Sequence, residues 1–157
     1  MSQIDVGEKI PDFSAKATSD IDFTLSHYQG SPILLYFYPR DNTPGCTQEG
    51  KDFRDNYVVF KEKGIQIFGI SRDSIKVHEN FKAKHEFPFE LISDKEETIC
   101  SLFDVIKEKK LYGKVHMGIE RSTFLIDSKG ILHSQWRKVK VKEHIDQVLD
   151  AIENNLN

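Results

Sequence analysis

A cysteine at the start of a predicted helix is the group in this chain best placed to do chemistry. Cys46 closes the segment 39–46, which follows the apolar run 33–38 and precedes the amphipathic stretch 47–63. The run predicts a buried strand and the stretch predicts a helix, so Cys46 would lie in a first helical turn at the carboxyl end of a central strand. Unpaired backbone N–H groups and the helix dipole favour a thiolate there, and ligands gather at that edge of open α/β sheets. The pattern therefore indicates a nucleophilic cysteine.

Composition and charge narrow the classes of protein to consider. The chain has 157 residues, of which 30% are charged and 38% hydrophobic, which favours one globular domain spanning residues 1–157. Its formal net charge of -3 gives no signal for binding a polyanion, so nucleic acid is not an expected partner. No apolar run approaches the roughly 18 residues of a membrane helix. Residues 1–9 lack the basic start and apolar stretch of a targeting segment, so we expect a cytoplasmic protein.

The order of predicted elements favours an α/β, thioredoxin-like fold. Strands are expected at 12–17, 22–25, 33–38, 65–71, 89–93, 122–126 and 131–137. Helices are expected at 47–63, 74–85, around 99–103 and at 141–156. The first two strands predict an N-terminal hairpin extension, and a turn signal at 127–130 predicts a second hairpin. Strands alternating with helices then predict a mixed central sheet flanked by helices.

Several finer expectations concern surfaces and helix faces. Ser74 is the expected cap of the helix at 74–85, with Val77 and Phe81 on its inner face. Residues 104–118 are expected to form a charged loop. Basic residues alternate with valines in 137–142, which predicts one polar face of an edge strand. The histidines show no zinc-like spacing and are expected to be solvated surface residues, with no metal site: positions 27, 78, 85, 116, 133 and 144.

Several blocks of the chain, taken together, resemble one protein family. These blocks are Tyr36-Phe37-Tyr38-Pro39, Thr43-Pro44-Gly45-Cys46-Thr47, and the stretches 7–13, 52–54, 117–127 and 136–142. They resemble the Q-type peroxiredoxins, also called bacterioferritin comigratory proteins. The spacing Pro39-x-x-x-Thr43-x-x-Cys46 is similar to the active-site signature of peroxiredoxins in general. The resemblance covers nearly the whole chain.

The resemblance implies a role for each matching residue. Cys46 would be the peroxidatic cysteine, and Thr43 and Arg121 would bind the peroxide and activate the thiolate. Pro39 would shield the pocket, and Glu49 would orient Arg121. The resemblance also implies a thioredoxin fold with extra elements and no metal or organic cofactor.

Peroxide reduction by sulfur explains why such residue types would be needed. The thiolate attacks one oxygen while the other leaves, so the thiol pKa of about 8.5 must fall. Arg121 suits this task because its fork can contact both the sulfur and a peroxide oxygen. Thr43 can accept from the peroxide and donate toward the sulfur. Backbone N–H groups around Gly45 and Cys46 can stabilise the stretched O–O bond, as an oxyanion hole stabilises developing charge.

The cysteine pattern departs from that of many Q-type members. Lys51 stands where many members carry a resolving cysteine, five residues after Cys46. Other members carry it in the helix of the next βα unit, and the corresponding stretch 74–85 has no cysteine. The only other thiol is Cys100, expected to be a helix residue without a redox role, with resolution as the alternative. We therefore expect a one-cysteine enzyme whose Cys46 sulfenic acid is reduced by an external thiol such as glutathione, glutaredoxin or thioredoxin.

Other functions remain to be weighed against a peroxidase. A peroxide sensor or thiol–disulfide module without efficient turnover would use the same residues around Cys46. A thioredoxin-like disulfide reductase is disfavoured because the chain lacks Cys-x-x-Cys. A cysteine hydrolase is the weakest option because no histidine is obviously placed as its base. Family members of this type are often monomers, so we expect a monomer.

Overall fold

A five-stranded mixed sheet forms the centre of the computed structural model, which describes residues 4–154. The strands lie in the order β5-β4-β3-β8-β9. Three of them run parallel to one another: β3 (Ile33–Phe37), β4 (Gln66–Ser71) and β5 (Glu90–Ser93). The other two pair in antiparallel fashion: β8 (Ser122–Ile126) with β3, and β9 (Leu132–Trp136) with β8. This is the mixed sheet of a thioredoxin-like fold, as the element pattern predicts.

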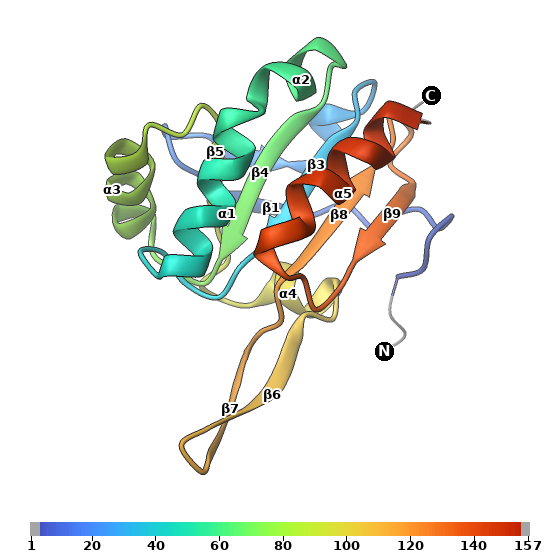
Figure 1. Cartoon of the computed structure of the whole chain (residues 1–157). Coiled ribbons are helices and arrows are strands. Elements are labelled where there is room, and N and C mark those ends of the chain that lie inside the picture. The colour runs from blue at the N-terminus through green and yellow to red at the C-terminus, as the bar shows by residue number, and fades with distance from the viewer. Residues whose placement is uncertain (1–3, 155–157) are drawn as a thin grey trace.

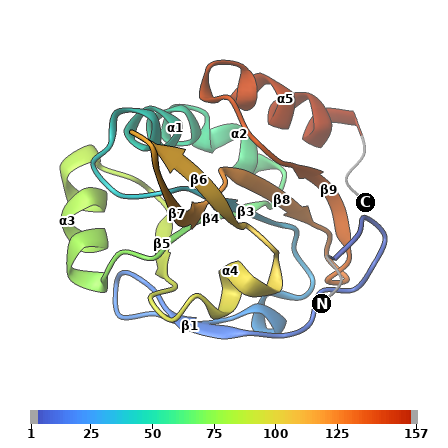
Figure 2. The same ribbon diagram turned by 90° about the horizontal axis from the view of Figure 1, so that it is seen from below.

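Helices and a small hairpin cover the two faces of this sheet (Figures 1 and 2). One layer contains α1 (Pro44–Asp55), α2 (Tyr57–Glu62) and α5 (Val141–Asn154), with α3 (Ile75–His85) beside β5. The opposite layer contains β1 (Ser14–Lys16), β2 (Asp22–Thr24), the 3-10 helix η1 (Leu25–Tyr28) and α4 (Thr98–Leu102). The antiparallel pair β1–β2 confirms the predicted N-terminal hairpin.

The central strand β3 is apolar throughout because both of its faces are buried. Ile33, Leu35 and Phe37 belong to the core cluster beneath β1, β2 and α4. Leu34 and Tyr36 belong to the cluster beneath α1 and α5. Side chains alternate between the faces of a strand, so burial on both faces requires a continuous apolar run.

The helix expected at 47–63 begins earlier and is interrupted. It starts at Pro44 and stops at Asn56, after which the short helix α2 begins. The side-chain amide of Asn56 donates to the Asp52 carbonyl at 2.9 Å, which ends the first helix locally. The earlier start keeps Cys46 in a first helical turn, as expected.

The inner face of α3 also differs from the expectation. Ser74 caps the helix as predicted, since its side chain accepts from the Val77 backbone N–H. Val77 is exposed, however, and His78 is buried beside Phe81. The face that packs on the sheet is therefore rotated by one residue from the predicted one.

Residues 104–118 do not form a loop. Most of them lie in an antiparallel hairpin of β6 (Ile106–Leu111) and β7 (Lys114–Ile119), which projects from the body of the molecule (Figure 1). The turn contains Tyr112 and Gly113, both with positive φ, which suits a tight hairpin turn. Much of β7 is exposed to solvent, so the hairpin lacks the buried apolar face that reveals most strands.

The prediction of an edge strand at 137–142 is also wrong. Strand β9 ends at Trp136, and Val141 already opens α5. Lys138 adopts a left-handed conformation with φ of 51°, which breaks the extended chain between them. The predicted end of the last helix, Leu156, lies outside the described residues. Within residues 4–154, no helix combines the length and the apolar character needed to span a bilayer.

Candidate active site

The carboxyl end of β3 leads directly into the first turn of α1, where Cys46 lies. Thr43 is the N-cap residue with an extended backbone, and Pro44 takes the first helical position, where its missing N–H costs no hydrogen bond. Cys46 follows as the third helical residue and is only 1% exposed. Its sulfur therefore lies near the positive end of the helix dipole and is almost fully shielded from solvent.

Arg121, between β7 and β8, brings a positive charge to the sulfur. Its Nη2 donates to the Cys46 Sγ at 3.4 Å, and its Nη1 donates to the Glu49 Oε1 at 2.6 Å. Glu49 lies in α1, close to one helical turn beyond Cys46. The structure therefore brings Cys46, Arg121 and Glu49 into one hydrogen-bonded chain, and the guanidinium stabilises a thiolate electrostatically.

Burial and neighbouring charges together set the pKa values of Glu49 and Arg121 in this ion pair. Burial raises the pKa of Glu49 to about 7, although the adjacent Arg121 opposes the shift. The Oε2 atom of Glu49 has no hydrogen-bond partner among the described residues, which also favours the protonated form. Burial alone would lower the pKa of Arg121, but Glu49 and Cys46 together raise it, so Arg121 stays charged.

Gly45 lies against the guanidinium of Arg121. A Cβ atom at this position would be 3.1 Å from the Arg121 Nη2, closer than ordinary van der Waals contact. The absence of a side chain therefore lets the first turn of α1 approach the guanidinium closely.

Thr43 and Pro39 lie on the loop before α1, and both are half-buried. The Thr43 Oγ1 donates to the Arg40 carbonyl at 2.9 Å and does not cap the helix through its side chain. In this arrangement the hydroxyl's own proton is engaged within the loop, while its lone pairs can accept a hydrogen bond.

Cys100 lies far from this site in the architecture. It belongs to the core cluster on the α4 side of the sheet, whereas Cys46 belongs to the cluster on the α1 side. Burial raises the pKa of the Cys100 thiol well above its usual range, with Asp94 adding to the shift. Asp94 also caps α4 by accepting from the Ile99 and Cys100 backbone N–H groups. Both cysteines are free thiols.

Two of the six histidines are buried, contrary to the expectation of solvated residues. His144 in α5 is 1% exposed, and its Nε2 pairs with the Thr123 hydroxyl at 2.6 Å. Burial lowers the pKa of His144 to about 4, so it is neutral at physiological pH. His78 is fully buried and pairs with Asp41 at 2.6 Å. The interval between His78 and Phe81, three residues on one helix face, was the sequence signal for its burial.

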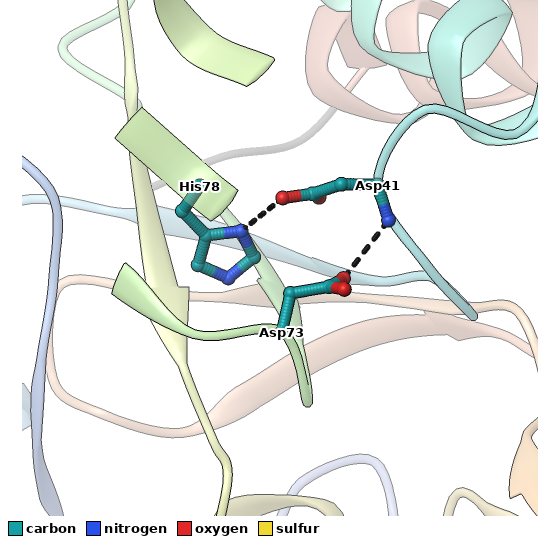
Figure 3. A group of neighbouring side chains, drawn as sticks. All are labelled: Asp41, Asp73 and His78. Carbon is teal, nitrogen blue, oxygen red and sulfur yellow. Dashed lines mark hydrogen bonds and ion pairs between the residues drawn. The ribbon is translucent and has the colours of Figure 1, made fainter. Parts of the chain in front are cut away.

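A group of Asp41, Asp73 and His78 is close enough in space to hold a metal ion (Figure 3). Its atoms are already engaged, however: both ring nitrogens of His78 are in hydrogen bonds, and the Asp73 Oδ2 accepts from the Asp41 backbone N–H. These contacts define a hydrogen-bond network beside the loop of Thr43. The sequence motif drew attention to Thr43 and Cys46 but not to Asp41.

The fold and the Cys46–Arg121 pair define a thioredoxin-fold protein with a buried thiol beside a guanidinium. The sequence model described as the AhpC/TSA family matches residues 6–135. Peroxiredoxin Bcp of Bacillus subtilis is 49% identical over 151 residues, covering 96% of each chain. Peroxiredoxin Bcp of Xanthomonas campestris is 53% identical over 129 residues, covering 82% of this chain and 81% of the relative.

Solved structures agree with these relatives. A structure of Xylella fastidiosa PrxQ superposes with a TM-score of 0.91 at 39% identity, covering 98% of both chains. One of Xanthomonas campestris bacterioferritin comigratory protein, described for its alkyl peroxide reduction activity, gives 0.89 at 46% identity, covering 95% of this chain and 98% of that one. The chain therefore belongs to the AhpC/TSA family and is a Q-type peroxiredoxin of the bacterioferritin comigratory group. It is a thiol-dependent peroxidase.

Proposed function

We propose that this peroxidase reduces hydrogen peroxide and small organic hydroperoxides at Cys46 without a resolving cysteine of its own. The observation that carries the proposal is the placement of the two cysteines. Cys46 and Cys100 are the only thiols of the chain, and they belong to core clusters on opposite faces of the central sheet. A disulfide between them would require Cα atoms within about 7 Å, which the intervening sheet prevents unless the core opens. An external thiol must then complete the cycle.

Each residue of the site has a separate role in the reduction of the peroxide by Cys46. Arg121 stabilises the thiolate and contacts the peroxide, while Glu49 fixes the guanidinium. Thr43 accepts from the peroxide, and Gly45 supplies a backbone N–H and the space for Arg121. Pro39, half-buried at the end of β3, limits the access of water.

The chemistry balances as one displacement at a peroxide oxygen followed by two displacements at sulfur. The Cys46 thiolate attacks one peroxide oxygen, the O–O bond breaks, and the departing hydroxide or alkoxide takes up a proton. The resulting sulfenic acid is then attacked by an external thiol, which releases water and leaves a mixed disulfide. A second external thiol frees Cys46 and leaves as the oxidised reductant.

The nearly complete burial of Cys46 supports small substrates. A sulfur 1% exposed gives access to hydrogen peroxide and to the terminal oxygen of a slender alkyl hydroperoxide. The alkyl peroxide reduction described for the Xanthomonas campestris protein, 46% identical, supports the same substrate class.

The low reactivity of Cys100 supports the one-cysteine cycle. Its raised pKa leaves almost no thiolate at neutral pH to attack a sulfenic acid. Solved structures of Xanthomonas campestris Peroxiredoxin Q include serine variants at two different cysteines. In this chain, Lys51 and the stretch 74–85 offer no such second thiol near Cys46.

The proposed cycle also indicates which external thiols could reduce Cys46 and in which cellular compartment the protein would act. Thioredoxin, glutaredoxin and glutathione are the external thiols that fit it. Two free cysteines suit a reducing compartment such as the cytoplasm. We propose that residues 1–157 act as a single-domain monomer, since the site described above is complete within one chain.

Steady-state peroxide consumption tests the proposal with wild type, Cys100→Ser and Cys46→Ser, each supplied in turn with thioredoxin, glutaredoxin or glutathione. We expect Cys100→Ser to turn over like wild type and Cys46→Ser to be inactive. Severe loss of turnover in Cys100→Ser, or a Cys46–Cys100 disulfide in peroxide-treated protein, would contradict the one-cysteine cycle. Fast oxidation without turnover by any of the three reductants would favour a peroxide sensor.

A further inference from the structure

A buried polar network lies beside the loop that leads to Cys46 (Figure 3). The Asp41 Oδ1 accepts from the Tyr38 hydroxyl at 2.6 Å, and its Oδ2 pairs with the His78 Nδ1 at 2.6 Å. The His78 Nε2 is 3.0 Å from the Ile92 carbonyl oxygen. The side chains of Asp41 and His78 are both 0% exposed.

The proton positions in this network follow from its acceptors. The Ile92 carbonyl can only accept, so the His78 Nε2 carries a hydrogen and donates it. One further proton lies between the His78 Nδ1 and the Asp41 carboxyl group. Each polar atom of the two side chains thus has a partner, which makes the network rigid and costly to disturb.

A second branch ties the loop backbone to β4. The Asp41 N–H donates to the Asp73 Oδ2 at 2.9 Å, and the Ser71 hydroxyl donates to the same atom at 2.6 Å. The loop after β3 is therefore fixed to β4, to α3 through His78 and to β5 through Ile92. These contacts hold Asn42 in a left-handed conformation with φ of 66°, immediately before Thr43.

A bound metal ion is the alternative explanation for the grouping of Asp41, Asp73 and His78. Coordination would need lone pairs of His78, Asp41 and Asp73, yet each of these side chains is engaged by a neighbour. Both ring nitrogens of His78 are engaged, and its Nε2 donates a hydrogen to the Ile92 carbonyl, so this nitrogen offers no lone pair to a cation. Hydrogen bonding therefore explains the cluster without an ion.

We propose that Asp41 and His78 are positioning residues for peroxide reduction. They hold the loop 40–43 so that Thr43 and the first turn of α1 face the peroxide at Cys46. The inference rests on the proposed roles of Thr43 and Cys46. The network acts through position, because its groups are buried behind the loop and bonded to one another.

The variant Asp41→Asn separates position from charge. Its amide oxygen can accept from the Tyr38 hydroxyl, and its NH2 group can donate to the Nδ1 of a neutral His78. The Nε2–H of His78 then still donates to the Ile92 carbonyl. Asp41→Ala removes these bonds, and His78→Phe keeps the ring volume but leaves the Asp41 carboxylate unpaired.

Two reactions of Cys46 supply the readout. Oxidation by hydrogen peroxide depends on Thr43 and the loop, whereas alkylation by iodoacetamide depends on the thiolate and not on peroxide contacts. We expect Asp41→Asn to oxidise at close to the wild-type rate, and Asp41→Ala and His78→Phe to oxidise at least about tenfold more slowly. Alkylation should not slow in any of them.

Milder variants keep the test decisive if Asp41→Ala or His78→Phe fails to fold. Tyr38→Phe deletes only the hydroxyl that Asp41 accepts, and should slow oxidation by about threefold. Thr18→Val removes a partly buried bond from Thr18 to Glu90 at 2.6 Å and a buried one from the Leu91 N–H at 2.9 Å. It serves as the matched control with unchanged oxidation.

Three results would overturn the inference. A loss in Asp41→Asn as large as in Asp41→Ala would show that charge or a proton matters instead of position. Equal slowing of oxidation and alkylation would show general structural support. Wild-type oxidation rates in folded Asp41→Ala and Tyr38→Phe would show that the network has no role in the oxidation of Cys46. Slow oxidation of the wild type itself would instead contradict the proposed function.

Discussion

Arg121 lies between Cys46 and Glu49, and we propose that its position governs the reactivity of Cys46. Its two terminal nitrogens reach the Cys46 sulfur and the Glu49 carboxylate at 3.4 and 2.6 Å. The shorter bond fixes the guanidinium, and the longer one leaves a nitrogen that can turn toward an incoming oxygen. Preorganised charge of this kind stabilises the transition state without reorganisation at the moment of reaction.

Gly45→Ala tests the close approach of Arg121 to the first turn of α1. The added Cβ would lie 3.1 Å from the Arg121 Nη2 and push the guanidinium away from its position. We expect a folded protein whose oxidation by hydrogen peroxide is slowed by roughly tenfold or more, since small displacements of catalytic groups have large effects. Stopped-flow oxidation measures this directly.

Gly118→Ala is the matched control for that substitution. The atoms nearest to its Cβ would be those of the flexible Lys109 side chain, at 3.3 Å, so the oxidation rate should not change. Equal rates for Gly45→Ala and wild type would show that Arg121 has freedom to move without loss of function.

Glu49 predicts a pH dependence of stability. Its pKa is raised from 4.5 to about 7 in the folded protein, so the native state holds the extra proton between these values. The stabilisation is fully present below pH 4.5 and is lost as the pH rises through 7. In a Cys46→Ser background, we expect the unfolding free energy to fall more between pH 5 and pH 8 than in the same protein carrying Glu49→Gln, as measured with denaturant.

The opposite trend would contradict the protonated form of Glu49. If the unfolding free energy rises with pH relative to the Glu49→Gln protein, the carboxylate is ionised throughout and its pairing with Arg121 outweighs its burial.

The sequence predicted some site residues better than others, for a physical reason. Cys46 and Thr43 stand in one short motif whose strand and helix neighbours place them, so local pattern was sufficient. Asp41 and His78 are 37 residues apart and meet only through the packing of α3 on the sheet. A buried pair between distant segments leaves little trace in a single sequence.

At the scale of elements, α5 is attached to the sheet by a polar contact as well as by its apolar face. Val148 and Ile152 are buried in the core cluster on the α1 side. His144 adds a hydrogen bond to Thr123 of β8 at 2.6 Å. A neutral imidazole suits this position, because burial penalises the charged form of the ring.

His144 therefore predicts an acid-sensitive docking of α5. Its pKa is lowered from 6.5 to about 4, so the stabilisation is present above pH 6.5 and is lost as the pH falls through 4. The full shift corresponds to about 3 kcal/mol of unfolding free energy. We expect a His144→Gln protein to lose less stability than wild type between pH 6.5 and 4, by denaturant titration. An equal loss in both would place the acid sensitivity elsewhere.

Elements with buried apolar runs were predictable, and exposed ones were not. The strand β3 was recognisable because both of its faces are covered, so each of its residues is apolar. The hairpin β6–β7 was expected to be a loop because lysines stand on its exposed surface and little apolar pattern remains. Backbone pairing across a tight turn determines that hairpin, and this pairing is weakly encoded in composition.

For the molecule as a whole, the central sheet separates the two thiols. Cys46 faces the layer of α1 and α5, and Cys100 faces the layer of α4. In the proposed one-cysteine cycle, the sulfenic acid waits for an external thiol, and during that time a second peroxide can oxidise it further.

Overoxidation should follow when peroxide is in excess and no reductant is present. We expect Cys46 to gain two oxygens as a sulfinic acid while Cys100 remains a thiol, because burial keeps the latter protonated. Mass spectrometry of peptides from the treated protein measures both. Absence of the sulfinic product on Cys46 would indicate that another group in the protein traps the sulfenic acid first.

Stopped-flow oxidation of the reduced protein by hydrogen peroxide, followed by the fluorescence of Trp136, is the most direct test. Wild type, Cys100→Ser and Cys46→Ser are compared under identical conditions. Rapid oxidation, far above that of free cysteine, is predicted for the first two at equal rates and should be absent in the third. An ordinary thiol rate in wild type, or a slower reaction in Cys100→Ser, would contradict an activated Cys46 that works without a second cysteine.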